Sequence, residues 1–215
     1  MGKHNTPLER YLRPTYWIDC DTESIKEKAR DLTEQNSTMS EKAKSLFYFV
    51  RDEIKYNPYP PFGNPDLYRA SLVLGNGEGY CVQKAVLLAA LARAIGIPAR
   101  LRLSDIKNHL SPPKLLEEMG TNIFVFHGYN ELYVGLSWVK AVASFDLEMC
   151  NKNKIIPVEF DGRNNALFHS HNREGELHIE YLRDRGHYED LPLGEILHSF
   201  KDYYNKDRST QADQE

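Results

Sequence analysis

Cysteine is scarce in this sequence, which has three such residues among 215: Cys20, Cys81 and Cys150. An odd, sparse set of this kind does not form a disulfide framework. No two of them stand in a Cys-x-x-Cys pair, so the pattern of a structural zinc site is missing as well. We therefore expect free thiols in a reducing cytoplasm, with no metal and no other cofactor.

Long apolar runs and an excess of basic residues are also missing. No apolar run reaches the roughly 18 residues that a membrane-spanning helix needs, and the opening stretch 1–14 has no apolar core of the signal-peptide type. Lys and Arg number 27 against 31 Asp and Glu, which gives a net charge of -4 without a basic stripe. We therefore expect neither a membrane nor a nucleic acid as a partner.

The composition that remains is that of a globular domain. Hydrophobic residues make up 41% and charged residues 27%, and a chain of this length buries a sizeable core. Neither an internal repeat nor a long linker marks a boundary. We predict one domain over 1–205, with a core at about 42–150, an extension at 151–205, and a polar, frayed tail at 206–215.

Hydrophobic spacing and punctuation predict helices in the first half and strands later. A capping box, Thr38 to Glu41, opens a helix, and the proline-rich stretch 57–65 forces a loop. The run CVQKAVLLAALARAIGI, rich in Ala and Leu, predicts a buried central helix from Cys81 to about Gly96. The other expected helices are 22–35, 111–119 and 192–204; the expected strands are 99–103, 122–134, 136–145 and 157–160.

Cys81 stands where a glycine turn meets the central helix. A helix N-terminus carries partial positive charge and free N–H groups, which favour a thiolate and bind a developing oxyanion. This position therefore suits a nucleophile. Taken alone, a lone cysteine is more commonly a small buried core residue.

A thiol nucleophile needs a base and a group that orients the base. His127 lies within the strand 122–134, and Asp146 ends the next one. An antiparallel turn would bring Asp146 back towards His127. Each has a purely structural alternative. A histidine on a strand is commonly a core residue, and Asp146 also suits the N-cap of a helix that follows it. The order Cys, His, Asp on helix, strand and strand is more specific than any one of the three.

The stretch around Cys81 resembles the nucleophile segment of the transglutaminase-like cysteine superfamily. That family has Gly-x-Cys, a helix and then Arg-x-x-Gly-Ile-Pro-Ala-Arg, which Arg93–Arg100 match. HGYNELY resembles the family's His-Ala-Trp-x-Glu-Val strand, with Gly128 and Tyr129 departing from it. Trp138 and Asp146 resemble the third motif, although the spacing is longer and Leu147 follows the Asp. FVRDEIKYN resembles the helix and Ile-x-Tyr that precede the family core.

The resemblance implies an α+β, papain-like fold with the Cys-bearing helix packed on an antiparallel sheet. It implies catalysis by Cys81, His127 and Asp146, through a thioester, on the amide bond of a peptide, protein or small molecule. Hydrolysis is our preferred reaction. Acyl transfer to an amine, or a non-catalytic binding domain of the same fold, are the alternatives, and neither the substrate nor the oligomeric state follows from the sequence. A second oxyanion donor is expected from the loop upstream of Cys81, and the sequence does not assign this role to Gln83 or Tyr80.

Three other groups carry weaker signals. His169 and His171 lack a third ligand, so a solvated loop is preferred to a metal site. EFDGRNN, residues 159–165, is expected to be a turn more than a substrate contact. A set of aromatic residues near the prolines could wall a substrate site, although loop packing is preferred: Tyr56, Tyr59, Phe62 and Tyr68.

Overall fold

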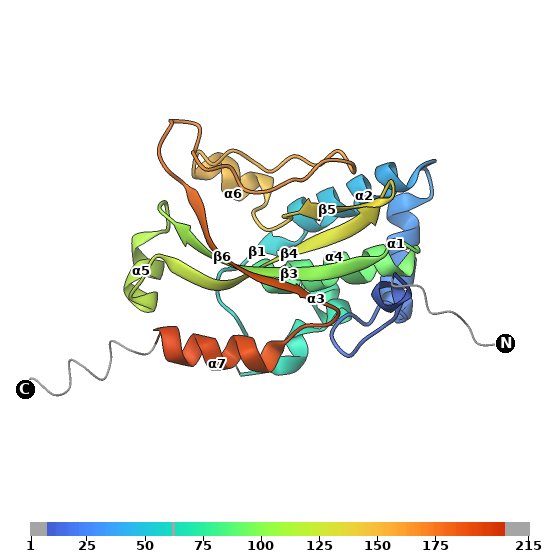
Figure 1. Ribbon diagram of the computed structural model, residues 1–215, viewed down its shortest axis with the longest axis horizontal. Helices are drawn as coiled ribbons and strands as arrows, with labels where there is room; N and C mark the ends of the chain where they lie inside the picture. The colour runs from blue at the N-terminus through green and yellow to red at the C-terminus, as the bar shows by residue number, and fades with distance from the viewer. Residues whose placement is uncertain (1–7, 62, 205–215) are drawn as a thin grey trace, which may run out of the picture.

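A four-stranded antiparallel sheet forms the framework of the protein (Figure 1), whose computed structural model describes residues 8–61 and 63–204. Its strands follow the order β5-β4-β3-β6, and each neighbouring pair is antiparallel. The strand bounds are β3 (Ala99–Asn108), β4 (Ile123–Val134), β5 (Ser137–Ala141) and β6 (Ile179–Tyr188).

The central helix α4 (Cys81–Ala94) is buried along its whole length from Cys81 to Arg93. A helix that is apolar on all sides needs cover on all sides. The sheet, mainly β4, covers one side, and three helices pack on α4 as well. These are α1 (Glu23–Thr33), α2 (Met39–Tyr48) and α3 (Ala70–Asn76). The expected α+β fold, with the Cys-bearing helix on an antiparallel sheet, is therefore confirmed.

Short elements connect these helices and aim the chain at the start of α4. The Thr38–Glu41 capping box is present as expected. After α2 the chain passes through a π-helical turn, a short strand at Lys55–Tyr56 and the proline-rich loop. A second short strand, Glu78–Gly79, pairs with the first in parallel and lies just before Cys81. The bounds of the short elements before α4 are η1 (Glu9–Leu12), η2 (Phe49–Glu53), β1 (Lys55–Tyr56), η3 (Pro65–Tyr68) and β2 (Glu78–Gly79). One further short helix, α5 (Pro113–Met119), lies between β3 and β4.

The chain after β5 departs from the sequence-based expectation. The expected strand at 157–160 is wrong, because these residues form an irregular segment. This segment instead packs Phe160 on Phe47 of α2. The chain then returns as β6, which was not expected. Most of its side chains are exposed, so it lacks the alternation that marks a strand with one buried face.

Two helices belong to this extension, α6 (Leu147–Lys152) and α7 (Leu193–Tyr204). The closing helix α7 matches the expected 192–204 and buries Leu193, Ile196 and Phe200. It contacts β4, and Figure 1 shows it running along the lower side of the sheet, in red. The tail 206–215 lies outside the described residues.

Candidate active site

Cys81 is the first residue of α4, directly after the N-cap Tyr80. Its side chain is buried, with 8% of its surface exposed. Burial raises the pKa of the Cys81 thiol to about 11, and the backbone N–H groups of Gly128 and Val82 oppose this rise. The helix start therefore acts in the expected direction, but desolvation outweighs it. Cys81 is a thiol at neutral pH in this structure.

His127 lies on β4 opposite Ser104 of β3. The ring is buried, and it packs near Phe168 and Tyr129 at centroid distances of 5.1 and 6.1 Å. Its Nε2 atom is buried without a hydrogen-bond partner among the described residues. Burial lowers the pKa of His127 to about 3, so the imidazole is neutral at rest.

An irregularity in the sheet directly precedes His127. The β3–β4 register shifts between Ser104 and Ile106, and Phe126 adopts a left-handed backbone with φ 57°. Asp105 holds this residue, because its Oδ1 accepts a hydrogen bond of 3.1 Å from the Phe126 N–H. Arg185 of β6 binds the same carboxylate and stacks on the Phe126 ring at 4.0 Å. Bulges commonly re-aim a side chain near a functional site, and here the re-aimed neighbour is His127.

The residues that follow Cys81 and His127 touch each other. A β-carbon at Gly128 would lie 2.8 Å from the Cα atom of Val82. Two residues further along, the Asn130 side chain donates a hydrogen bond of 2.8 Å to the Ala85 carbonyl. These contacts fix β4 against the first turn of α4, and so fix Cys81 relative to His127.

Cys81 and His127 both line two cavities. The larger has a volume of about 540 Å³ and the smaller about 240 Å³. Tyr56, Pro58, Leu115 and Phe124 are also common to both. A substrate carbonyl placed at Cys81 would therefore have space on either side of it.

Asp146 lies at the N-cap of α6. One carboxylate oxygen accepts a hydrogen bond of 2.7 Å from the Met149 N–H, and the other accepts one of 3.0 Å from the Tyr56 N–H. Asp146 does not bind Nε2 of His127, which has no partner among the described residues. The structure thus places Cys81 and His127 together and uses Asp146 to hold Tyr56, whose ring packs against Phe145 at 4.9 Å.

Lys84 is a buried lysine one helical turn after Cys81. Its side chain is fully buried and donates hydrogen bonds of 3.0 and 2.6 Å to the carbonyls of Arg51 and Ile54. Burial lowers the pKa of Lys84 to about 7, while the charges of Asp146 and Asp52 oppose this. Lys84 and Asp146 therefore both hold the segment that carries Tyr56 to the cavities.

Comparison with known proteins places the central part of this chain in a family. A sequence model of the transglutaminase-like superfamily matches residues 26–143, which is more than half of the chain. The chain belongs to the transglutaminase-like superfamily. Membership supports a cysteine enzyme in general terms and leaves the reaction open. No match was found among curated proteins.

One solved structure supports this fold. A Cytophaga hutchinsonii protein assigned provisionally to the cysteine proteases has a TM-score of 0.50 at 14% identity; the match covers 86% of this chain and 55% of that one. This transglutaminase-like chain thus spans about half the length of that protein. Weaker similarities are to a protein from Parabacteroides distasonis provisionally called a protease (TM-score 0.44, 18% identity, 64% of this chain, 26% of that one) and to a TGase (0.38, 17%, 58%, 31%).

The structure shows the surroundings of the weaker candidates from the sequence. His169 and His171 are exposed, and no group of three or more His, Cys, Asp or Glu side chains in the described part of the chain could hold a metal ion. Asp161 forms the expected turn, because it accepts hydrogen bonds from the N–H groups of Arg163 and Asn164.

No helix in residues 8–61 and 63–204 is long and apolar enough to cross a membrane.

The aromatic residues near the prolines lie in two different environments. Tyr56 and Tyr59 line the larger cavity, and the Tyr56 ring also packs against Phe145, so a substrate-facing role for these two residues stays a prediction. Tyr68 is a core residue with no exposed surface, and Phe62 lies outside the described residues. Asp105, Arg185 and Lys84 were not among the sequence candidates, because nothing in their local sequence shows that they support residues far along the chain.

Proposed function

We propose that this protein is a cysteine enzyme that cleaves an amide bond through a thioester on Cys81. The observation that carries the proposal is the shared position of Cys81 and His127 on both cavities, in a chain of the transglutaminase-like superfamily. A scaffold protein would need neither a cavity at the thiol nor an imidazole beside it.

The proposed reaction starts from a neutral pair. His127 takes the thiol proton as the Cys81 sulfur attacks the carbonyl carbon, and the C–S bond forms. The same proton passes from His127 to the leaving nitrogen as the C–N bond breaks, which leaves a thioester and a free amine. Water then attacks the thioester, His127 takes its proton, and the proton returns to sulfur as the acid leaves.

The oxyanion of the intermediate needs donors that are already in place. The N–H group of Cys81, in the first turn of α4, supplies one in this proposal. Gln83 is already engaged, because its amide donates to the Leu67 carbonyl and accepts from the Tyr80 N–H. We assign the second donor to the Tyr56 hydroxyl, since Tyr56 lines both cavities beside Cys81 and burial raises its pKa, so that the hydroxyl keeps its proton.

We retain Asp146 as the third residue of the proposed triad. An ionised carboxylate accepts about four hydrogen bonds, and two backbone N–H groups occupy Asp146 here. It therefore has lone pairs left for a further donor, and in this proposal that donor is the His127 imidazolium formed during the reaction. Its charge would stabilise that imidazolium, as in other triads.

Hydrolysis is preferred to transfer onto an amine because of the lining of the smaller cavity. Its described lining residues include neither Asp nor Glu. A lysine ammonium in such a site would lose its hydration without gaining a counter-charge. Water carries no such cost.

Replacement of the nucleophile tests this function. We expect Cys81→Ala to release no amine from any amide that the wild type cleaves, with folding unchanged. Cys150→Ala is the matched control, because Cys150 is also buried and also has its pKa raised to about 11, and it should keep activity. Amine release with and without an added primary amine separates hydrolysis from transfer. A Cys81→Ala protein at the wild-type rate would refute the mechanism.

A further inference from the structure

The larger cavity beside Cys81 has an apolar, aromatic wall. Its described lining residues carry formal charge at two positions only, Glu118 and Lys201, and both side chains are exposed. His127 is neutral, since burial lowers its pKa to about 3. The apolar part of the wall consists largely of Tyr56, Tyr59, Tyr80, Leu115, Met119, Phe124, Phe126, Leu197, Phe200 and Tyr204.

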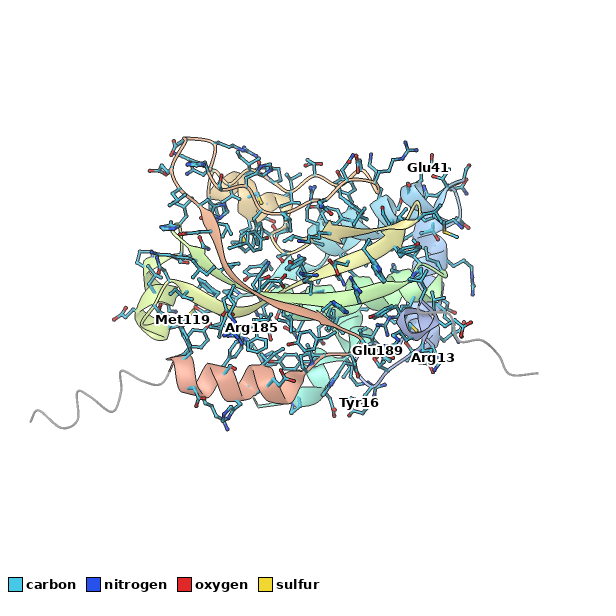
Figure 2. The ribbon with its side chains drawn as sticks, in the orientation of Figure 1. Arg13, Tyr16, Glu41, Met119, Arg185 and Glu189 are labelled. Carbon is cyan, nitrogen blue, oxygen red and sulfur yellow. The ribbon has the colours of Figure 1, made fainter. Side chains whose placement is uncertain are left out.

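One side of this wall comes from α7, which follows the family-matched region 26–143. Leu197, Phe200 and Tyr204 lie along α7 at helical spacing and all line the cavity. The Tyr204 hydroxyl accepts a hydrogen bond of 2.9 Å from the Val125 N–H, two residues before His127. In Figure 2, Met119 and Arg185 lie between the strands and α7. The helix is therefore attached to the strand that carries the proposed base.

The size and chemistry of this cavity restrict what it can hold. A volume of about 540 Å³ lies within the range of sites for small organic ligands, roughly 300–1,000 Å³. An apolar wall favours groups that lose water at little cost, and a charged or strongly polar group would be left unpaired there. The occupant that fits is a neutral group with an aromatic ring or a comparable aliphatic body.

We propose that the substrate of the Cys81 site is an amide whose acyl group is large and apolar, and that α7 selects it by forming one wall of the cavity of about 540 Å³. This inference rests on the proposed function, because it places the substrate carbonyl at Cys81. It goes beyond that function by naming the chemical class of the acyl group and the helix that recognises it. Leu197 is the position of choice for a test, since it is partly exposed and lines the cavity.

Two fluorogenic amides with the same leaving group test the selection: the acetyl and the 3-phenylpropionyl amides of 7-amino-4-methylcoumarin. We expect kcat/KM of the wild type to be higher for the phenylpropionyl amide by about 10- to 100-fold, as extra methylene and ring contacts give in apolar pockets. Leu197→Trp fills the cavity and should bring this ratio close to one, mainly by slowing the larger amide. His198→Ala, whose side chain is 78% exposed on the same helix, should leave the ratio unchanged.

Direct binding separates this inference from the proposed function. We expect 3-phenylpropionamide to bind the Cys81→Ala protein at least tenfold more tightly than acetamide does, in an NMR titration, and Leu197→Trp to remove the difference. Binding of this kind without amide cleavage by the wild type would refute the function and keep the cavity assignment. Equal binding of the two amides, or binding of neither, would overturn the assignment, and so would cleavage of both coumarin amides at one rate.

Discussion

Gly128 of β4 lies so close to α4 that a β-carbon there would stand 2.8 Å from the Cα atom of Val82. This contact joins the residue after His127 to the residue after Cys81. Backbone lies on both sides of the contact, so an added methyl group could be accommodated only by moving β4 or α4. The spacing of the proposed catalytic pair therefore depends on glycine at position 128.

We expect Gly128→Ala to lower the free energy of unfolding by about 1–3 kcal/mol, as overpacking does, and to lower kcat by separating Cys81 from His127. Urea unfolding and amide cleavage measure the two effects. Gly75→Ala is the matched control: an added β-carbon there meets no atom within 4 Å, and alanine suits the interior of α3 better than glycine. Wild-type stability and activity in Gly128→Ala would show that the contact is unimportant.

The pKa values of the resting pair predict the pH dependence of alkylation. Because burial holds the Cys81 thiol at a pKa of about 11 and His127 at about 3, little thiolate exists near neutral pH. The rate of iodoacetamide labelling at Cys81 should rise about tenfold per pH unit between pH 7 and 10, measured by peptide mapping. A plateau of fast labelling from pH 5 to 8 would instead indicate a thiolate–imidazolium ion pair.

Lys84 predicts a pH dependence of stability. Its pKa is lowered to about 7 in the fold against roughly 10.4 in an unfolded chain. Between these values the unfolded state binds more protons, so the stabilisation from Lys84 rises with pH. We expect Lys84→Met, which leaves the Arg51 and Ile54 carbonyls unpaired, to be less stable than the wild type by about 1–3 kcal/mol at pH 9.

The difference between Lys84→Met and the wild type should shrink as the pH falls towards 6, because the buried lysine then carries its charge at a cost. Chemical denaturation at a series of pH values measures it. A difference that stays constant from pH 6 to 9 would contradict the lowered pKa.

Asp146 has two roles that one substitution can separate. Asn is also a good N-cap, so Asp146→Asn should keep α6 and cost about 1–2 kcal/mol in stability. If the carboxylate stabilises the His127 imidazolium, kcat should fall at least about 100-fold in the folded variant. A kcat within a few-fold of the wild type would restrict Asp146 to its observed bonds with Met149 and Tyr56.

The sequence predicted those parts of the molecule whose signals are local. The Thr38 capping box, the apolar run after Cys81 and the His127 strand each carry their pattern within a few residues. β6 was missed because its exposed edge position gives no alternation. The bulge at Phe126 was missed because its support comes from Asp105 and Arg185, which lie on other strands.

The same difference between local signals and long-range packing decides which parts of the site could be predicted. The order of the motifs was enough to predict that Cys81 and His127 come together. One starts a helix and the other lies on a strand, and both elements can be predicted from the local sequence. The pKa of Cys81 could not be inferred, because it depends on how much water the surrounding fold excludes. The bonds of Asp146 to Tyr56, and the wall supplied by α7, depend on packing between segments far apart in the chain.

The covalent intermediate tests the central claim most directly. The wild type is mixed with the fastest-cleaved amide, quenched with acid within milliseconds, and analysed by intact mass and peptide mapping. We predict one acyl group on Cys81, a much smaller amount in His127→Ala, and none in Cys81→Ala. Amine release without any acyl group on Cys81, or at the wild-type rate from Cys81→Ala, would contradict the account.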